Sequence, residues 1–336
     1  MKIFKLTLFL AVISYLPVFA QFHPAANTFG SNAIYKDSSI IVAWASECII
    51  SRGFIDFSDT SKTYSQNGIT SNKAFFGESQ NAIGYPNDIN DVVSFGDGGS
   101  AILSFEQTIT DGDGYDFAVF ENGLKSQFTP FQYFLELAFV EVSTNGIDFV
   151  RFPATSLTQT EIQISSYGQI NPENINNLAG KYIVDYGTPF DLSELKDSTK
   201  IDIKNINKIK IIDVVGSLNT EFSSIDNSGN KINDPFPTPF WTSGFDLAGV
   251  GIINTKQMFT IENLAYVYPN PFNDILNINC LENCLLELFN ISGSIIFEKN
   301  LNEGFNQIIL NELQKGLYIA KIFSENNINT FKIIKQ

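Results

Sequence analysis

The apolar residues of this chain fall into short runs, and each run ends at a turn rich in glycine, asparagine or serine. Before residue 255 such runs cover 101–105, 115–121, 134–142, 149–152, 209–215 and 245–253. Runs of this length between turn residues are typical of β-strands, and Asn145-Gly146 between two of them is a hairpin signal. Helical periodicity is confined to 171–178 and 191–195, which predict single turns. The sequence therefore predicts an all-β fold.

Composition and charge limit the class of partner. Of the 336 residues, 44% are apolar and 17% charged, which supports a sizeable core and excludes global disorder. The formal net charge is -15. Nucleic acids and anionic membranes need a basic face on their partner, so neither is expected to bind. An acidic surface suits cations, above all calcium, and neutral ligands such as sugars.

Histidine and cysteine are too scarce for much of catalytic chemistry. His23 is the one histidine, so a histidine-rich zinc site cannot be built, and a catalytic triad would have to use a residue near the N-terminus. Cys48, Cys280 and Cys284 cannot all pair internally. A local Cys280–Cys284 disulfide is one option, which leaves Cys48 as a buried thiol.

Residues 1–20 have the pattern of a secretory signal peptide. Lys2 and Lys5 precede an apolar stretch over 6–19, and Val18-Phe19-Ala20 suits cleavage before Gln21. An N-terminal core helix is the alternative. No later segment has 18 uninterrupted apolar residues, so no transmembrane segment is expected in the mature chain.

A boundary lies near residues 255–266. We expect one domain over 21–258, a linker over 259–266 and a second domain over 267–336. The second domain contains six strand-length runs, at 275–278, 285–290, 294–297, 307–310, 316–322 and 330–334. Six or seven such strands in about seventy residues predict a small immunoglobulin-like β-sandwich.

This second domain resembles the type A C-terminal sorting domain of the type IX secretion system of Bacteroidota. The resemblance rests on the segments 267–272, 286–293, 316–322 and 331–335, in that order and at the chain end. The sorting signal it implies comprises Tyr268, Pro269, Asn270, Pro271, Gly293, Gly316, Tyr318, Lys332 and Lys335. It further implies export through the periplasm to the outer surface or the medium, with the domain usually removed and the cargo released or attached to surface lipopolysaccharide. A plain immunoglobulin-like accessory module is the alternative.

Residues 75–255 resemble secreted bacterial cell-surface proteins of uncertain function. The matching segments include 92–100, 113–122, 139–146, 213–216, 234–238 and 244–247. More distantly, the region looks like a galactose-binding-like jelly roll. The resemblance implies a jelly-roll-like β-sandwich as the cargo domain.

Acidic loops are the first candidate sites. Asp111, Asp113 and Asp116 alternate with glycine, and Glu121 follows on the next strand. Calcium takes six to eight oxygen ligands, which closely spaced carboxylates in a flexible loop supply, so we expect a calcium site here. A second candidate combines Asp226 and Asp234. The alternative for the first candidate is a solvated Asp-Gly turn between strands, and for the second a long hairpin tip stiffened by prolines. For Asp213 and Asp246, at the ends of apolar strands, structural roles are expected.

Aromatic residues in loops are the second kind of candidate, because exposed rings stack on sugar faces. Trp241, Phe240 and Tyr186 are the expected ligand-binding residues. Together these features predict a non-catalytic, calcium-stabilised module that binds a glycan or another surface ligand. One alternative is an adhesion protein that binds other proteins. The other is a glycan hydrolase using Glu121, Glu136 or Glu141, although the last two, five apart on one predicted strand, would point to opposite faces.

Overall fold

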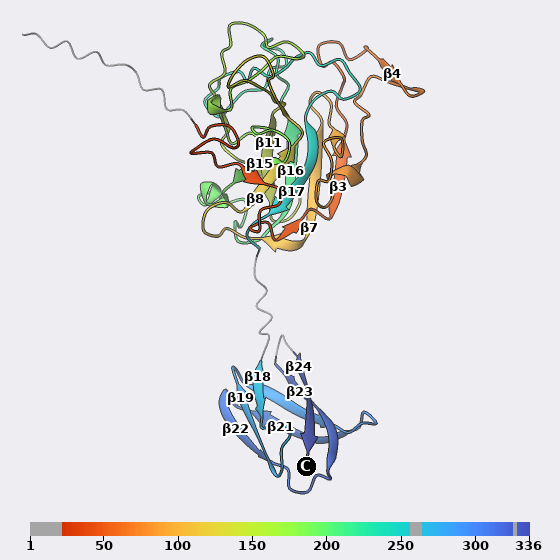
Figure 1. The fold of residues 1–336 in the computed structure, drawn as a ribbon, viewed down its shortest axis with the longest axis vertical. Coiled ribbons are helices and arrows are strands. Elements are labelled where there is room, and N and C mark those ends of the chain that lie inside the picture. The colour runs from red at the N-terminus through yellow and green to blue at the C-terminus, as the bar shows by residue number, and fades with distance from the viewer. Residues whose placement is uncertain (1–21, 256–263, 325–327) are drawn as a thin grey trace, which may run out of the picture. The chain divides into compact units, whose positions relative to one another are not determined.

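The computed structural model describes residues 22–255, 264–324 and 328–336 (Figure 1). The chain divides into two compact units, Met1–Lys256 and Gln257–Gln336. The predicted signal peptide lies outside the described residues. Within the described ranges, no helix has the length and apolar character needed to cross a membrane.

The first unit is built on two antiparallel sheets. In one, the strands lie in the order β1 (Ile34–Tyr35), β15 (Tyr186–Phe190), β8 (Phe117–Glu121), β17 (Asp246–Ile252) and β2 (Ala43–Trp44), and β6 (Val93–Ser94) also pairs with β17. In the other, the order is β12 (Val150–Arg151), β11 (Ala138–Ser143), β16 (Ile206–Asp213), β7 (Ser100–Ile109) and β3 (Glu47–Ser51). The predicted all-β fold is confirmed.

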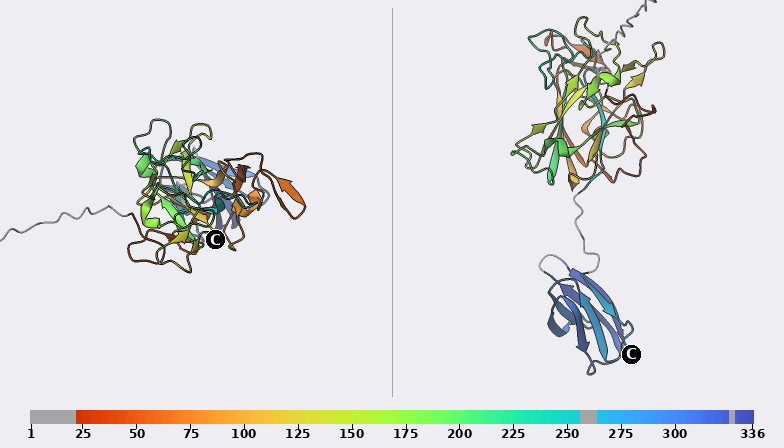
Figure 2. Two further views of the ribbon diagram at one scale, coloured as in Figure 1. Left: turned by 90° about the horizontal axis from the view of Figure 1, so that it is seen from above. Right: turned by 90° about the vertical axis from the view of Figure 1, so that its left-hand side faces the viewer.

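One hydrophobic cluster joins the two sheets. Phe117 and Val250 from the first sheet pack with Leu103, Val140 and Ile211 from the second. The sheets therefore form the two layers of a β-sandwich, which Figure 2 shows from two further sides. Burial of these aliphatic and aromatic side chains supplies the main stabilising free energy of the unit, at about 25 cal/mol per Å² of apolar surface.

The central strands β8 and β17 are buried on both faces. Every residue of both strands is buried. A second cluster, formed by Val92, Ala118, Phe120 and Ala248, covers the face turned away from the sandwich, with Trp44 packed against it. This cover explains why these strands show continuous apolar runs instead of an alternation of polar and apolar residues.

Short elements lie in the loops. They are β4 (Tyr64–Gln66), β5 (Ile69–Ser71), β9 (Leu124–Lys125), β10 (Tyr133–Phe134), β13 (Thr155–Ser156), β14 (Ile175–Asn176) and the 3₁₀ turns η1 (Ser79–Ala82), η2 (Pro172–Asn174) and η3 (Leu192–Leu195). The turns η2 and η3 occupy the two segments with predicted helical turns. The strand predicted over 134–142 is wrong, because β10 ends at Phe134 and β11 begins only at Ala138.

The second unit is a smaller β-sandwich. One sheet has the order β18 (Ala265–Tyr268), β19 (Ile275–Cys280), β22 (Gly304–Ile309), and the other β21 (Ile295–Leu301), β20 (Cys284–Phe289), β23 (Gly316–Phe323), β24 (Ile328–Lys335). Leu264 and Ala265 are buried in its core, so the predicted linker ends too late in the sequence. Cys280 and Cys284 are buried free thiols and not a disulfide.

Candidate functional site

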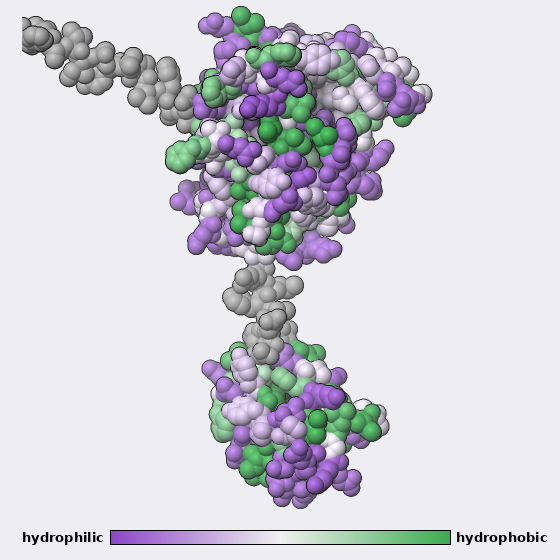
Figure 3. Space-filling view, in the orientation of Figure 1, coloured by the Kyte–Doolittle hydropathy of each residue, from purple (hydrophilic) through white to green (hydrophobic). Residues whose placement is uncertain are grey.

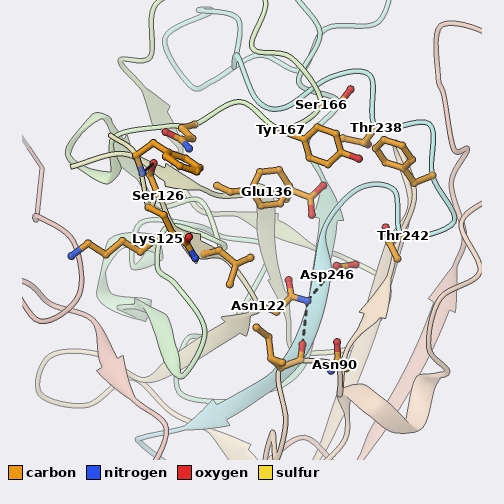
Figure 4. Close-up of a pocket in the computed structure, with 17 residues that line it drawn as sticks. Asn90, Asn122, Lys125, Ser126, Glu136, Ser166, Tyr167, Thr238, Thr242 and Asp246 are labelled. Carbon is orange, nitrogen blue, oxygen red and sulfur yellow. Dashed lines mark hydrogen bonds between the residues drawn. The ribbon is translucent and has the colours of Figure 1, made fainter. Parts of the chain in front are cut away.

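A cavity of about 530 Å³ opens in the first unit. Figure 4 shows its lining, in which carboxyl, amide and hydroxyl groups face aromatic rings. Asn122 follows β8, Glu136 precedes β11, and Asp246 begins β17. Tyr167 and Phe240 come from loops. The lining therefore combines strand ends, which are held by the sandwich, with loop residues.

The sheet register gathers the acidic residues at one end of the sandwich. Leu247 pairs with Glu121, so the last residue of β8 lies beside the first residues of β17. In the other sheet Ala138 pairs with Asp213, so the start of β11 meets the end of β16. Antiparallel pairing thus brings residues more than a hundred positions apart to the same rim.

Asp246 is buried and held by polar neighbours. Its carboxylate accepts hydrogen bonds from the Ser94 hydroxyl and from Asn122 Nδ2, the latter at 3.5 Å. Burial raises the pKa of Asp246 to about 7, while Ser94, Asn122 and the nearby Arg52 guanidinium act in the opposite direction. This carboxyl group is fixed in place by its neighbours.

Glu136 is buried to a similar degree but lacks such partners. It is 6% exposed and lines the cavity. Among the described residues, no hydrogen bond or ion pair to its carboxyl group is recorded. Burial, followed by the charges of Asp246 and Glu121, raises the pKa of Glu136 well above its usual range. Because Glu136 lines the cavity, its carboxyl group can be reached by a molecule that enters it.

Glu121 lies behind the cavity, 2% exposed. Its Oε2 accepts a hydrogen bond from the Gly123 amide at 2.6 Å, and its Oε1 is buried with no partner among the described residues. Burial and the charge of Asp246 raise the pKa of Glu121 well above its usual range. It does not line the cavity, but its charge is one of the causes that raise the pKa of Glu136.

Other buried carboxylates nearby are structural. Asp213 accepts hydrogen bonds from the amides of Gly98 at 2.8 Å and Phe245 at 2.7 Å. Asp234 Oδ2 accepts one from the Leu137 amide at 2.7 Å. These contacts tie loops to strand ends, which agrees with the structural role expected for Asp213. Asp246, for which the same was expected, also lines the cavity.

The predicted calcium loop is assembled only in part. Oxygen atoms of Asp111, Asp116 and Asp191 lie within 4.8 Å of one another, whereas Asp113 is exposed and outside this group. Glu121 lies at the far end of β8, five residues from Asp116 and on the order of 16 Å away along the strand, so it does not join the loop. Asp191, which caps η3, was missed because it lies far along the sequence from the loop.

Existing contacts already occupy several of these oxygens. Lys204 Nζ lies 2.7 Å from Asp111 Oδ2. Asp116 accepts hydrogen bonds from the amides of Gly112 and Leu192 and from Asn254 Nδ2. Burial raises the pKa of Asp116 to about 6, against these hydrogen bonds. Calcium binding at this loop stays a prediction.

The second predicted metal pair is not assembled among the described residues. Asp226 accepts hydrogen bonds from the amides of Ser156, Ser228 and Asn230, which stabilises a hairpin tip. Asp234, as described above, binds the backbone of another segment. The alternative stated for this pair, a long hairpin tip, describes Asp226 better.

Of the three predicted ligand-binding aromatics, only Phe240 lines the cavity. Its ring stacks on Tyr167, with centroids 5.6 Å apart and an interplanar angle of 28°. Trp241 instead packs edge-on against Phe76 at 4.9 Å. Tyr186 packs against another tyrosine on β1, outside the cavity. Tyr167, a loop residue 73% exposed, was missed by the sequence reading.

The single strand expected to hold Glu136 and Glu141 also needs correction. Glu136 and Glu141 do not share a strand, because Glu136 precedes β11 and Glu141 lies within it. Glu141 pairs with Arg151, with 2.7 Å between oxygen and nitrogen. Glu136 therefore lines the cavity while Glu141 is occupied elsewhere. The other carboxyl group in the cavity lining is that of Asp246, which the sequence analysis did not name as a catalytic candidate.

Comparisons with known proteins concern mainly the second unit. The family model of the secretion system C-terminal sorting domain matches residues 266–336. No curated protein matches the chain.

Solved structures give only distant likenesses. PorZ of Porphyromonas gingivalis, described as a surface component of the type IX secretion system, shares 10% identity at a TM-score of 0.21, over 81% of this chain and 41% of that one. A β-glucuronidase of Bacteroides uniformis shares 10% identity at 0.21, over 87% and 34%. The chain thus spans less than half the length of either protein, and these scores carry no functional argument.

The matched domain settles where the chain goes. It covers all of the second sandwich from Tyr266 onward and includes the segments on which the sequence resemblance rested. Such a domain directs its chain by way of the periplasm to the cell surface or the medium. Residues 266–336 are thus a C-terminal sorting domain of the type IX secretion system, and the first unit is its cargo.

Proposed function

We propose that the cargo domain is a binding module whose cavity takes a small carbohydrate. The observation that carries this proposal is the combination of the stacked Tyr167 and Phe240 rings with the buried carboxyl groups of Glu136 and Asp246 in one cavity. A sugar ring has an apolar face that stacks on aromatic side chains and hydroxyl groups that need directional hydrogen bonds. The two aromatic rings offer a surface for the apolar face, and the two carboxyl groups can hydrogen-bond to the hydroxyl groups.

The size of the cavity supports the same proposal. Ligand sites usually enclose about 300–1,000 Å³, and this cavity of about 530 Å³ falls within that range. Phe128, 91% exposed, also lines it, which adds an accessible ring for a second sugar unit. Elsewhere the visible surface of the unit is a mixture of polar and apolar residues (Figure 3).

Alanine substitution tests the proposal. Tyr167→Ala and Phe240→Ala in the full mature chain are expected to weaken binding of a glycan found by array screening about tenfold or more, because stacked aromatic contacts contribute roughly 0.5–1.5 kcal/mol beyond their buried area. Tyr186→Ala, which removes a ring outside the cavity, serves as the matched control. Equal affinities for all four proteins would place the glycan elsewhere.

A hydrolase is the second candidate, because two carboxyl groups with different surroundings share the cavity. Burial raises the pKa of Glu136, which favours the protonated form that a general acid needs, while Asp246 is fixed by Ser94 and Asn122. New reducing ends released from a bound glycan, and lost in Glu136→Gln, would favour this candidate. Binding with no product over prolonged incubation would leave the domain a binding module.

Processing of the exported chain is also a proposal. We propose that the sorting domain is removed during export and that the cargo is then released or attached to surface lipopolysaccharide. The separate hydrophobic cores of the two units support it, because removal of one core leaves the other complete. Mass spectrometry of the surface-exposed protein would give the cleavage position and any attached lipopolysaccharide.

A further inference from the structure

We propose that the ligand of the cavity carries a primary ammonium group, and that Glu136 binds it. The ligand class is then an amino sugar with a free amine. This inference rests on the proposed carbohydrate-binding function and narrows it. It starts from the one lining carboxyl group for which no partner is recorded among the described residues.

The first step concerns what Glu136 lacks. Glu136 is 6% exposed as a residue and faces only the cavity, so hydrogen-bond donors or an opposite charge for its carboxylate have to come from what enters the cavity. Its neighbour Asp246 has Ser94, Asn122 and the charge of Arg52. An ammonium group would supply both the positive charge and three donors to Glu136.

The second step concerns the charges that face Glu136. Four carboxyl groups raise the pKa of Glu136 through their charges. They are Asp246 on β17, Glu121 on β8, Asp213 on β16 and Asp234 in the loop after β16. Lys125 on β9 is the one basic residue in the described lining, but it is exposed and points away from Glu136 in Figure 4. Acidic groups therefore surround Glu136, and each one that is ionised favours a cation in the cavity.

The third step distinguishes an organic cation from a metal ion. In the described part of the chain, the one group of three acidic residues whose oxygens converge within 4.8 Å is at Asp111, away from the cavity. A cavity of about 530 Å³ is also far larger than a single ion. The rings of Tyr167 and Phe240 favour an organic cation, because aromatic faces attract ammonium groups.

Proton linkage gives the proposal a specific signature. Burial raises the pKa of Glu136 well above its usual range in the free protein, which favours the protonated carboxyl group. A bound ammonium group favours the ionised carboxylate and lowers that pKa. Binding therefore releases a proton, and affinity rises with pH for as long as the amine stays charged. A neutral sugar that accepts a hydrogen bond from the protonated carboxyl group gives the opposite trend.

Calorimetry with a matched pair of disaccharides tests the inference. The probes are the β-1,4-linked disaccharide of glucosamine with free amines and the same disaccharide with both amines acetylated. With the full mature chain at about pH 6, below the pKa of ordinary amines, we expect the free-amine form to bind at least tenfold more tightly. Titration in two buffers of different ionisation enthalpy should show proton release for that form alone.

Variants assign the effect to Glu136. In Glu136→Gln the preference for the free amine should fall below about twofold and proton release should vanish, while affinity for the acetylated form is retained. Asp111→Asn, outside the cavity, should behave as the unmodified chain. Equal binding of both disaccharides would overturn the amine inference and leave the carbohydrate proposal standing. Binding of glycans only at residues outside the cavity would overturn both.

Discussion

At the scale of single residues, the buried carboxyl groups differ in where their hydrogen bonds go. Asp213 uses both oxygens on backbone amides, so it stabilises the fold. Glu136 has no recorded partner within the described residues and faces the cavity. Asp213 and Glu136 are therefore similarly buried but differ in role, and the difference is visible only in the hydrogen bonds of their carboxyl oxygens.

We predict that calcium stabilises the first unit by binding at the acidic loop that contains Asp111. Calcium at about one hundred times its dissociation constant should stabilise the first unit by about 2.7 kcal/mol, or roughly 5–10 °C in melting temperature. Asp191→Asn should abolish this rise, because Asp191 belongs to the acidic group. Asp113→Asn, an exposed residue outside it, should preserve the rise. Circular dichroism melts with calcium and with a chelator measure both. A rise that depends on Asp113 instead would restore the ligand set expected from the sequence.

The sequence predicted parts of the candidate site and missed the rest for a definable reason. Phe240 was predicted as a loop aromatic, which is recognisable locally, and Glu136 was named only as one of the carboxylates of the hydrolase alternative. Tyr167 and the position of Asp246 in the cavity were not predicted. Asp246 begins a strand whose antiparallel pairing joins residues more than a hundred positions apart. Tyr167 comes from a loop that meets Phe240 only through the folding of distant segments.

At the scale of elements, the last two strands complete the sorting domain. β24 pairs with β23 along eight residues. Lys335 near the chain end is 6% exposed, and its Nζ lies 2.8 Å from Asp274 Oδ1 and over the Phe272 ring. Lys332, by contrast, is exposed. The two lysines of the predicted sorting signal therefore have different surroundings.

Export should depend on these strands. Deletion of Gly316–Gln336 removes β23 and β24 with the buried Tyr318, Ile322 and Ile333, so we expect the cargo to stay in the periplasm. Immunoblots of periplasm, surface and medium measure the distribution. Because the deletion also unfolds the domain, two point variants are needed to separate loss of folding from loss of recognition. Lys335→Gln should lower domain stability by about 1–3 kcal/mol, and Lys332→Gln should not. Export lost only in Lys332→Gln would point to recognition of the exposed face.

The presence of strands was easier to predict than the residues at which they begin and end. Apolar runs between turns located most strands of both sandwiches, since strand length and turn residues are local properties. The division between β10 and β11 was missed, because Leu135 and Leu137 are buried like strand residues and 134–142 is a mostly apolar run in the sequence. The start of β18 was missed for a similar reason, since Leu264 and Ala265 belong to a core formed mostly by later strands.

At the scale of the whole molecule, buried acids make stability depend on pH. Burial raises the pKa of Asp97 and Asp116 to about 6 and that of Asp246 to about 7. The folded state therefore holds protons that the unfolded state releases above about pH 4. The stabilising effect is complete below that pH and is lost as pH rises through 6 and 7.

We therefore expect the first unit to be more stable near pH 5 than near pH 8, by on the order of several kcal/mol. Both tryptophans, Trp44 and Trp241, lie in the first unit, so their fluorescence during urea unfolding of the full mature chain reports on this unit alone. Asp246→Asn should flatten part of the dependence. Stability that rises steadily from pH 5 to pH 8 would contradict the expectation.

The separate cores of the two units have a consequence for how such proteins evolve. No side chain is shared between the two hydrophobic clusters, so a substitution in one cannot be compensated by a change in the other. Recombination between genes near the codons for 256–263 would therefore replace the cargo domain and leave the sorting domain intact. Residues 264–336 fused to an unrelated soluble domain would be a transferable export tag, and the acidic cavity is free to diverge under selection for its own ligand.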